Sequence, residues 1–128
     1  MRWRTFGRTH VVAIDQLAEA ALRRDAIQLR ALVHELLSAY PDVGNVPAPL
    51  SSDSRVQAAS AGLVELLALR RAQNPPPWSE RFGALDEPFY LLASAANMRR
   101  LRDQCKRESP DPLRERKLYA PADFLTFA

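Results

Sequence analysis

Residues 25–40 read DAIQLRALVHELLSAY, and this stretch carries the most regular apolar stripe in the chain. Its apolar side chains recur at the spacing that places them on one face of an α-helix. Asp25 is a suitable N-cap, and Pro41 predicts that the helix ends at Tyr40, because the residue before a proline disfavours helical geometry. The stripe consists of Leu29, Leu32, Val33, Leu36, Leu37 and Tyr40.

The residues before this stretch predict a first helix that pairs with it. Apolar side chains recur at helical spacing over residues 11–22, and Arg23 and Arg24 fall in the last turn, where the helix dipole favours cations. Because the connection to Asp25 is so short, we expect the two helices to form an antiparallel hairpin. The apolar positions of the first helix are Val11, Ile14, Leu17, Ala18, Ala21 and Leu22.

A third helix is predicted after a proline-rich loop over residues 41–52. Ser52 or Asp53 can cap this helix, and its periodicity continues to about Gln73. The apolar stripe is wide, which is typical of a central helix with neighbours on two sides. It consists of Val56, Ala58, Ala59, Leu63, Val64, Leu66, Leu67 and Leu69.

Residues 74–77 break the third helix, and the stretch that follows predicts short helical turns that carry aromatic core residues. Ser94 can cap a fourth helix, which ends at the prolines within residues 109–112. A short turn is expected over residues 112–117. The apolar face of the fourth helix is formed by Ala95, Met98, Leu101 and Cys105.

The chain shows no alternating strand pattern bounded by turns. We therefore predict an all-α fold, with residues 1–128 forming a single helical domain. The domain is expected to be a compact bundle of four to five helices with short C-terminal turns. The tail is too apolar for a disordered segment, so most of residues 113–127 should pack on the same chain. Its large apolar side chains are Leu113, Leu118, Tyr119, Phe124, Leu125 and Phe127.

The net charge of +3 is unevenly distributed along the chain. Residues 11–98 carry seven basic and ten acidic groups, whereas residues 99–117 carry eight basic and four acidic groups, a difference of +4. A segment with this charge can attract phosphate. The alternative interpretation is a solvated helix face that is stabilised by ion pairs within the helix.

Composition also bears on the compartment. The single cysteine excludes an internal disulfide, which suits a reducing cytosol. No apolar run approaches the roughly 18 residues that span a bilayer. The apolar run after the basic N-terminus is too short for a signal peptide. We therefore expect a cytoplasmic protein without a membrane segment.

Candidate catalytic and metal-binding groups are few. His34 begins a segment that lacks the second histidine of a zinc-protease helix, because Ser38 stands in its place. Cys105 falls on an apolar helix face, where a small buried thiol is ordinary. One cysteine and two distant histidines make a poor metal site, and the scattered glycines build no phosphate-binding loop. The sequence therefore predicts no catalytic residue, no metal and no cofactor, and a protein that is not an enzyme.

The candidate partner-binding residues are basic and aromatic side chains. The basic groups of the fourth helix, with those of the turn after it, are expected to meet a partner. Trp3 interleaves with arginines, a mixture that can bind nucleic acid or an acidic partner, and the alternative is that it docks on the core. Trp78 is expected to anchor its loop. The set is Arg99, Arg100, Arg102, Lys106, Arg107, Arg114, Arg116, Trp3 and Trp78.

Three segments of the C-terminal third form a motif. Residues 87–91 read EPFYL, residues 108–116 read ESPDPLRER, and residues 118–125 read LYAPADFL. This motif resembles a family of small uncharacterised bacterial all-α proteins, and also the C-terminal part of antitoxins that are paired with nucleotidyltransferase-like toxins. Those antitoxins often carry an N-terminal helix-turn-helix domain, for which this chain shows no clear equivalent. The motif is typical of packing rather than of catalysis.

The missing catalytic constellation and the apolar tail favour a non-enzymatic protein-interaction module. We expect it to be antitoxin-like or an accessory subunit, with the product of a neighbouring gene in a bacterial operon as its protein partner. A homodimer is a second arrangement that the sequence leaves open. The alternative function is nucleic-acid binding by the basic helix at residues 99–107.

Overall fold

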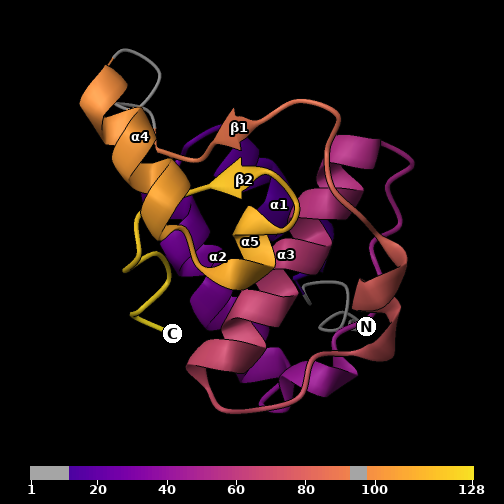
Figure 1. Cartoon of the computed structure of the whole chain (residues 1–128). Helices are drawn as coiled ribbons and strands as arrows, with labels where there is room; N and C mark the ends of the chain where they lie inside the picture. Colours follow the sequence, from indigo (N-terminus) through magenta and orange to yellow (C-terminus); the bar gives the residue numbers. More distant parts are fainter. Residues whose placement is uncertain (1–11, 93–97) are drawn as a thin grey trace, which may run out of the picture.

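The computed structural model describes residues 12–92 and 98–128, and it is predominantly helical (Figure 1). The helical fold class that the sequence predicts is confirmed. A short two-stranded sheet is the only β-structure within the described residues. The longer helices are α1 (Ile14–Leu22), α2 (Ala26–Ala39), α3 (Ser54–Arg70) and α4 (Arg99–Glu108). The shorter elements are η2 (Val43–Asn45), η3 (Pro77–Arg81), β1 (Phe89–Tyr90), α5 (Asp111–Arg114) and β2 (Leu118–Tyr119).

The predicted helix boundaries depend on local capping, and the structure confirms three of them. The Asp25 carboxylate accepts a hydrogen bond from the Gln28 backbone N–H, and α2 ends with Tyr40 as its C-cap residue, directly before a proline. Asp53, one of the two caps considered for α3, accepts a hydrogen bond from the Arg55 N–H. Short-range chemistry of this kind is readable from the sequence, because donor and acceptor are chain neighbours.

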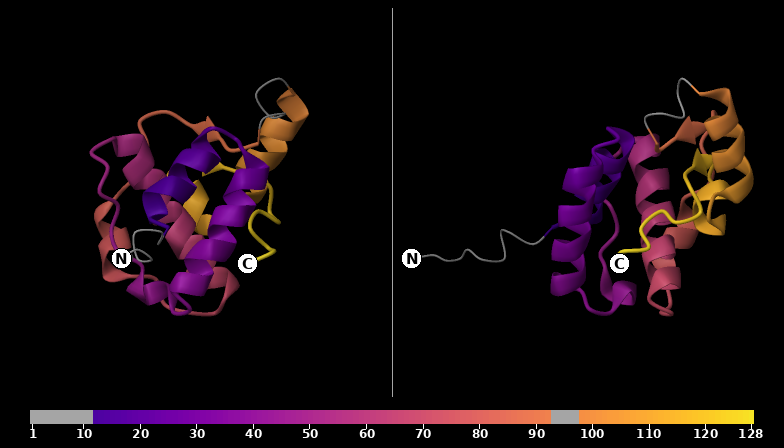
Figure 2. Two further views of the ribbon diagram at one scale, coloured as in Figure 1. Left: turned by 180° about the vertical axis from the view of Figure 1, so that it is seen from behind. Right: turned by 90° about the vertical axis from the view of Figure 1, so that its left-hand side faces the viewer.

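The hairpin of α1 and α2 forms one side of the domain. The two helices pack against each other across the turn at residues 23–25, where Arg24 adopts a left-handed conformation with φ of 59°. The side view in Figure 2 shows this hairpin as one layer, α3 as the next, and α5, the strands and α4 on the far side. The sequence-predicted pairing of the first two helices is thus present.

α3 is the central helix, as its wide stripe predicts. It packs against α1 on one side and against α5 and η3 on the other. Gly62 marks the crossing with α5, because a Cβ at this position would lie 3.0 Å from Leu113 Cδ2. The glycine lets the two helices approach closely. The side chains of α3 that are fully buried include Leu63, Val64, Leu66 and Leu67.

The sequence predicts no strand, and the structure corrects this. β1 and β2 pair in parallel, with Phe89 opposite Leu118 and Tyr90 opposite Tyr119. The pair continues in a hydrogen bond from the Leu91 N–H to the Tyr119 carbonyl. Strands of two residues are too short to show an alternating pattern, so their pairing depends on tertiary contacts. Because β1 forms at Phe89–Tyr90, the helical turns that the sequence predicts after residue 77 are limited to η3.

The C-terminal tail packs on its own chain, as expected. Leu113, Leu118 and Leu125 are buried in the main core together with residues of α1, α2 and α3. The Arg70 guanidinium donates hydrogen bonds to the carbonyls of Ala122 and Phe124, which fixes the last turn against the end of α3. The apolar tail is therefore part of the domain core.

Candidate partner-binding helix

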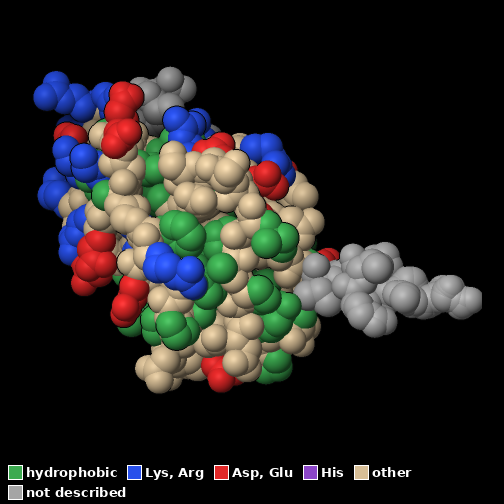
Figure 3. All heavy atoms as spheres, turned by 90° about the vertical axis from the view of Figure 1, so that its right-hand side faces the viewer, with side chains coloured by type: hydrophobic (Ala, Val, Ile, Leu, Met, Phe, Trp, Pro, Cys, Tyr) green, Lys and Arg blue, Asp and Glu red, His purple; other side chains and the backbone are tan. Residues whose placement is uncertain are grey.

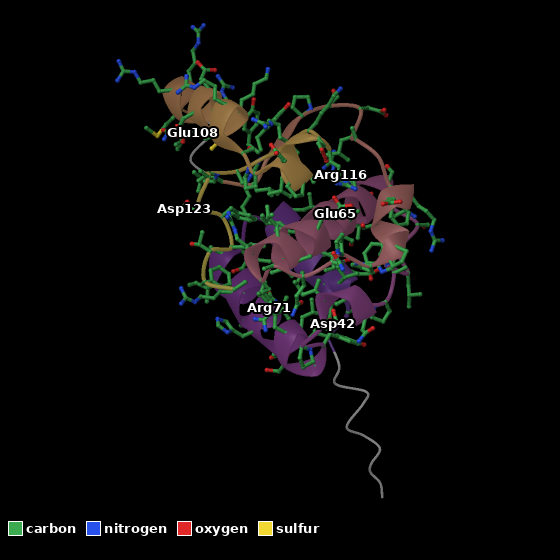
Figure 4. The ribbon with its side chains drawn as sticks, turned by 60° about the horizontal axis from the view of Figure 1, so that its bottom comes forward. Asp42, Glu65, Arg71, Glu108, Arg116 and Asp123 are labelled. Atoms are coloured by element: carbon green, nitrogen blue, oxygen red, sulfur yellow. The ribbon has the colours of Figure 1, made fainter. Side chains whose placement is uncertain are left out.

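The predicted site residues divide into those that fold into the core and those that reach solvent. Arg116 belongs to the first group, and its assignment as a partner-binding residue is wrong. Its side chain is buried and forms a two-pronged ion pair with Glu65, at 2.8 and 3.0 Å (Figure 4). The same guanidinium donates to the carbonyls of Phe82, Ser79 and Pro112.

Five donated hydrogen bonds match the five N–H groups of a guanidinium, so Arg116 has no donor left for a partner. The arrangement joins α5 to α3 and to the chain around η3. The half-buried carboxylate of Glu65 is held by a residue that cannot lose its charge under physiological conditions. Arg116 is therefore a structural residue of the core.

Trp78 is also a core residue, which corrects its place among the partner-binding candidates. Its side chain is buried, and its indole N–H donates a 2.7 Å hydrogen bond to the Val46 carbonyl. The Phe82 ring packs edge-on against it, with the ring centroids 6.1 Å apart. Trp78 therefore anchors the loop after α3, as the sequence also suggested. Trp3 lies outside the described residues.

Arg114 is exposed, but its guanidinium is already engaged. It forms an ion pair with Asp111 within α5 and donates a hydrogen bond to the Arg107 carbonyl at the end of α4. These contacts tie α5 to α4. Arg114 therefore supports the position of α4.

α4 projects from the rest of the domain (Figure 1), and it is attached through a small apolar cluster. Cys105 is buried beside Tyr119 of β2, and Leu101 packs against the same cluster. Tyr90 and Leu92 complete this support. The paired strands β1 and β2 thus provide the surface on which the apolar face of α4 rests.

The C-terminal end of α4 is fixed by a buried serine. The Ser109 hydroxyl lies 2.6 Å from the Cys105 carbonyl oxygen and 3.0 Å from that of Ala120. It also accepts a hydrogen bond from the Ala120 N–H. One side chain therefore satisfies backbone groups of both α4 and the segment after β2, which sets the direction in which the helix leaves the domain.

The outer face of α4 is strongly basic. The helix carries five cations and two carboxylates, Asp103 and Glu108, so its side chains sum to +3. Basic and acidic side chains gather on the flank of the molecule that carries α4 (Figure 3). Among the described residues none of the five cations forms an ion pair. The five are Arg99, Arg100, Arg102, Lys106 and Arg107, of which only Arg102 is half-buried.

The first turn of α4 carries positive charge at the N-terminal end of the helix, where the helix dipole disfavours cations. Three arginines lie near the N-terminal end, and no acidic residue is present in the first turn. Met98, the N-cap residue, provides no side-chain hydrogen bond, and it is 55 % exposed. The positive end of the helix dipole disfavours each nearby cation by roughly 0.3–1 kcal/mol. Such a local conflict is typical of a residue retained for function rather than for stability.

The structure places the two side chains that the sequence offered for catalysis, Cys105 and His34. Burial, and secondarily the charge of Glu108, raises the pKa of the Cys105 thiol, so the nucleophilic thiolate is disfavoured. His34 is exposed and stacks on the Phe127 ring at 5.7 Å. No cluster of three or more histidine, cysteine or acidic side chains that would hold a metal ion occurs in the described part of the chain. None of its helices is long and apolar enough to cross a membrane.

Comparison of the chain with protein-family models, curated proteins and solved structures gave no match. The resemblance of the C-terminal motif to antitoxins therefore stays a prediction. What the structure adds is the reason for the motif: Leu113, Leu118 and Leu125 are core side chains, and Ser109 and Arg116 satisfy buried backbone groups.

Proposed function

We propose that this chain is a non-enzymatic protein-interaction module that presents α4 to an acidic surface of a partner protein. The observation that carries the proposal is the first turn of α4, where Arg99, Arg100 and Arg102 gather at the unfavourable end of a projecting helix. A partner carboxylate placed there would pair with the arginines and also complement the helix dipole. The product of a neighbouring gene in the same operon, in an antitoxin-like or accessory arrangement, is the expected partner.

The charge pattern of α4 favours a protein over a nucleic acid. Asp103 lies four residues from both Arg99 and Arg107, so it falls in the middle of the basic face. A carboxylate in that place would repel a continuous row of phosphates. A protein surface of mixed charge can instead accommodate it, and the exposed Met98 at the helix start adds an apolar contact.

The test is a binding titration between the chain and the neighbouring gene product, followed by light scattering of the complex. Charge reversal of Arg99, Arg102 and Lys106 to glutamate should weaken binding at least about tenfold, which corresponds to about 1.4 kcal/mol. The matched control reverses Arg23, Arg71 and Arg81, which are exposed on other elements and change the net charge equally. Equal losses in both variants, or no complex at all, would contradict the proposal.

Nucleic-acid binding is the second candidate, because one specific feature favours it. Arg99, Arg102 and Lys106 follow one another at helical spacing and form a ridge along one side of α4. A ridge of this kind can follow a phosphate backbone. The affinity for a duplex or single strand should then fall steeply with salt, and each lost phosphate contact should reduce the slope by about one unit. Absence of binding at low salt excludes this function.

A further inference from the structure

A cleft of about 610 Å³ lies on another part of the surface, between the start of α2 and the C-terminal tail. The turn between α1 and α2 and the residues that follow β1 complete its walls. This volume falls in the range of about 300–1,000 Å³ that is usual for small-molecule sites. Most of the lining is apolar, and the larger apolar side chains are Leu29, Leu91, Leu92, Phe124, Leu125 and Phe127.

Two arginines supply the cationic part of the cleft. Arg24 donates from its Nε to the Tyr90 carbonyl at 2.9 Å, and its guanidinium lies 4.7 Å from the centre of the Phe89 ring. Arg30 lies over the Phe127 ring at 4.9 Å. These contacts hold both guanidinium groups in place, and the terminal nitrogens of Arg24 and Arg30 donate no hydrogen bond to other described residues. Both cations therefore have hydrogen-bonding capacity left.

The two carboxylates of the lining differ from the arginines in what they contact. Asp25 already accepts the hydrogen bond that caps α2, so its charge is directed at the first turn of that helix. Asp123 is exposed at the rim of the cleft. The cationic groups are thus the ones that a bound molecule would meet together with the apolar walls.

We propose that this cleft binds a small amphipathic carboxylic acid, with the apolar body against Leu29 and Leu125 and the carboxylate paired with the arginines of the lining, Arg24 and Arg30. A guanidinium matches a carboxylate with two parallel hydrogen bonds, and partial removal from water strengthens them. The inference is independent of the proposed function, because the cleft shares no residue with the basic face of α4.

Decanoate is a suitable probe, and decan-1-ol is its uncharged counterpart. Titration calorimetry should give at least about tenfold tighter binding of decanoate than of decanol, which corresponds to about 1.4 kcal/mol. Amide chemical shifts in nuclear magnetic resonance spectra should change around Ala26, Leu91 and Thr126. Equal affinity for both probes, shifts spread over the whole chain, or no binding of decanoate would overturn the proposal.

Substitutions then identify the groups that hold the carboxylate. Arg30→Gln should weaken the binding of decanoate about tenfold and leave the binding of decanol unchanged, and Arg24→Gln should have the same effect. Arg23→Gln is the matched control, because Arg23 lies in the same turn but outside the cleft. Thr126→Trp, at an exposed position of the lining, should reduce binding of both probes by filling the cleft. An equal loss with Arg23→Gln and Arg30→Gln would overturn the assignment.

Discussion

Arg116 and the arginines of α4 belong to one basic segment of the sequence, but they occupy opposite environments. Arg116 is buried, and all of its donors meet Glu65 or backbone carbonyls. Arg99 and Arg100 are exposed on a projecting helix, without an ion pair among the described residues. The comparison teaches that the count of basic residues in a segment says little about its surface charge, because one carboxylate at the edge of the core can hold an arginine away from solvent.

The largest effect on the stability of the fold is expected from removing Arg116, the buried arginine. Arg116→Ala leaves Glu65 without its partner, and it leaves the carbonyl of Phe82 without a donor. Breaking a largely buried ion pair in this way should lower the free energy of unfolding by about 3–5 kcal/mol. Chemical denaturation measures this loss, and Arg114→Ala, at an exposed position, is the control. A change below about 0.5 kcal/mol would place Arg116 at the surface.

Two neighbouring residues in the apolar stripe of α2 also differ in burial. Their substitution gives a loss of unfolding free energy with which the loss in Arg116→Ala can be compared. Leu36 is fully buried, whereas Leu37 is half-buried at the edge of the core. Leu36→Ala should therefore lower the free energy of unfolding by about 2–5 kcal/mol, and Leu37→Ala by less. Thermal and chemical unfolding of the two variants tests this order. Equal losses would show that both side chains are equally enclosed.

A substitution on α4 is expected to raise the free energy of unfolding, by a smaller amount than the losses above. Arg99→Glu replaces a cation with an anion at the positive end of the helix dipole, so it should stabilise the chain by about 0.3–1 kcal/mol. The same substitution should weaken binding of the acidic partner. Helix content and the unfolding midpoint report the first result, and the binding titration reports the second. A destabilised variant would show that Arg99 serves the fold.

The smallest effect is a pH dependence at the apolar face of α4. Because burial raises the pKa of Cys105 in the folded chain, the unfolded thiol ionises first as the pH rises. The folded state then binds more protons than the unfolded state, and stability falls as the pH rises above about 8.5, the usual pKa of a free thiol. Cys105→Ala should lack this part of the decline. Identical pH profiles of the two proteins would show that the thiol reaches water.

The sequence predicts what chain neighbours determine, and it misses what distant residues determine. Asp25 and Asp53 cap helices through N–H groups two or three residues away, so both were found as candidates. Glu65 and Arg116 are separated by 51 positions, and no pattern in the residues near either of them predicts that they form an ion pair. The strands β1 and β2 escaped prediction for the same reason.

The candidate site shows the same division. The exposed cations of α4 could be named from helical periodicity alone, because their apolar neighbours Leu101 and Cys105 identify the opposite face. The cleft beside α2 could not be found in this way. Its walls come from residues 21–30, 91–92 and 121–127, which only the folded chain brings together.

The attachment of α4 has a consequence for how the segment that carries it can change in length. The segment that carries α4 begins after Leu91, whose N–H donates a hydrogen bond to the Tyr119 carbonyl. It ends at Ser109, whose hydroxyl is hydrogen-bonded to the backbone of Ala120, the residue next to Tyr119. The two ends of this segment therefore lie close together, beside β2. Doubling the length of such a loop costs only about 0.6 kcal/mol in closure entropy. We therefore expect changes in the length of this segment to cost little closure free energy as long as Leu91 and Ser109 keep its two ends in place.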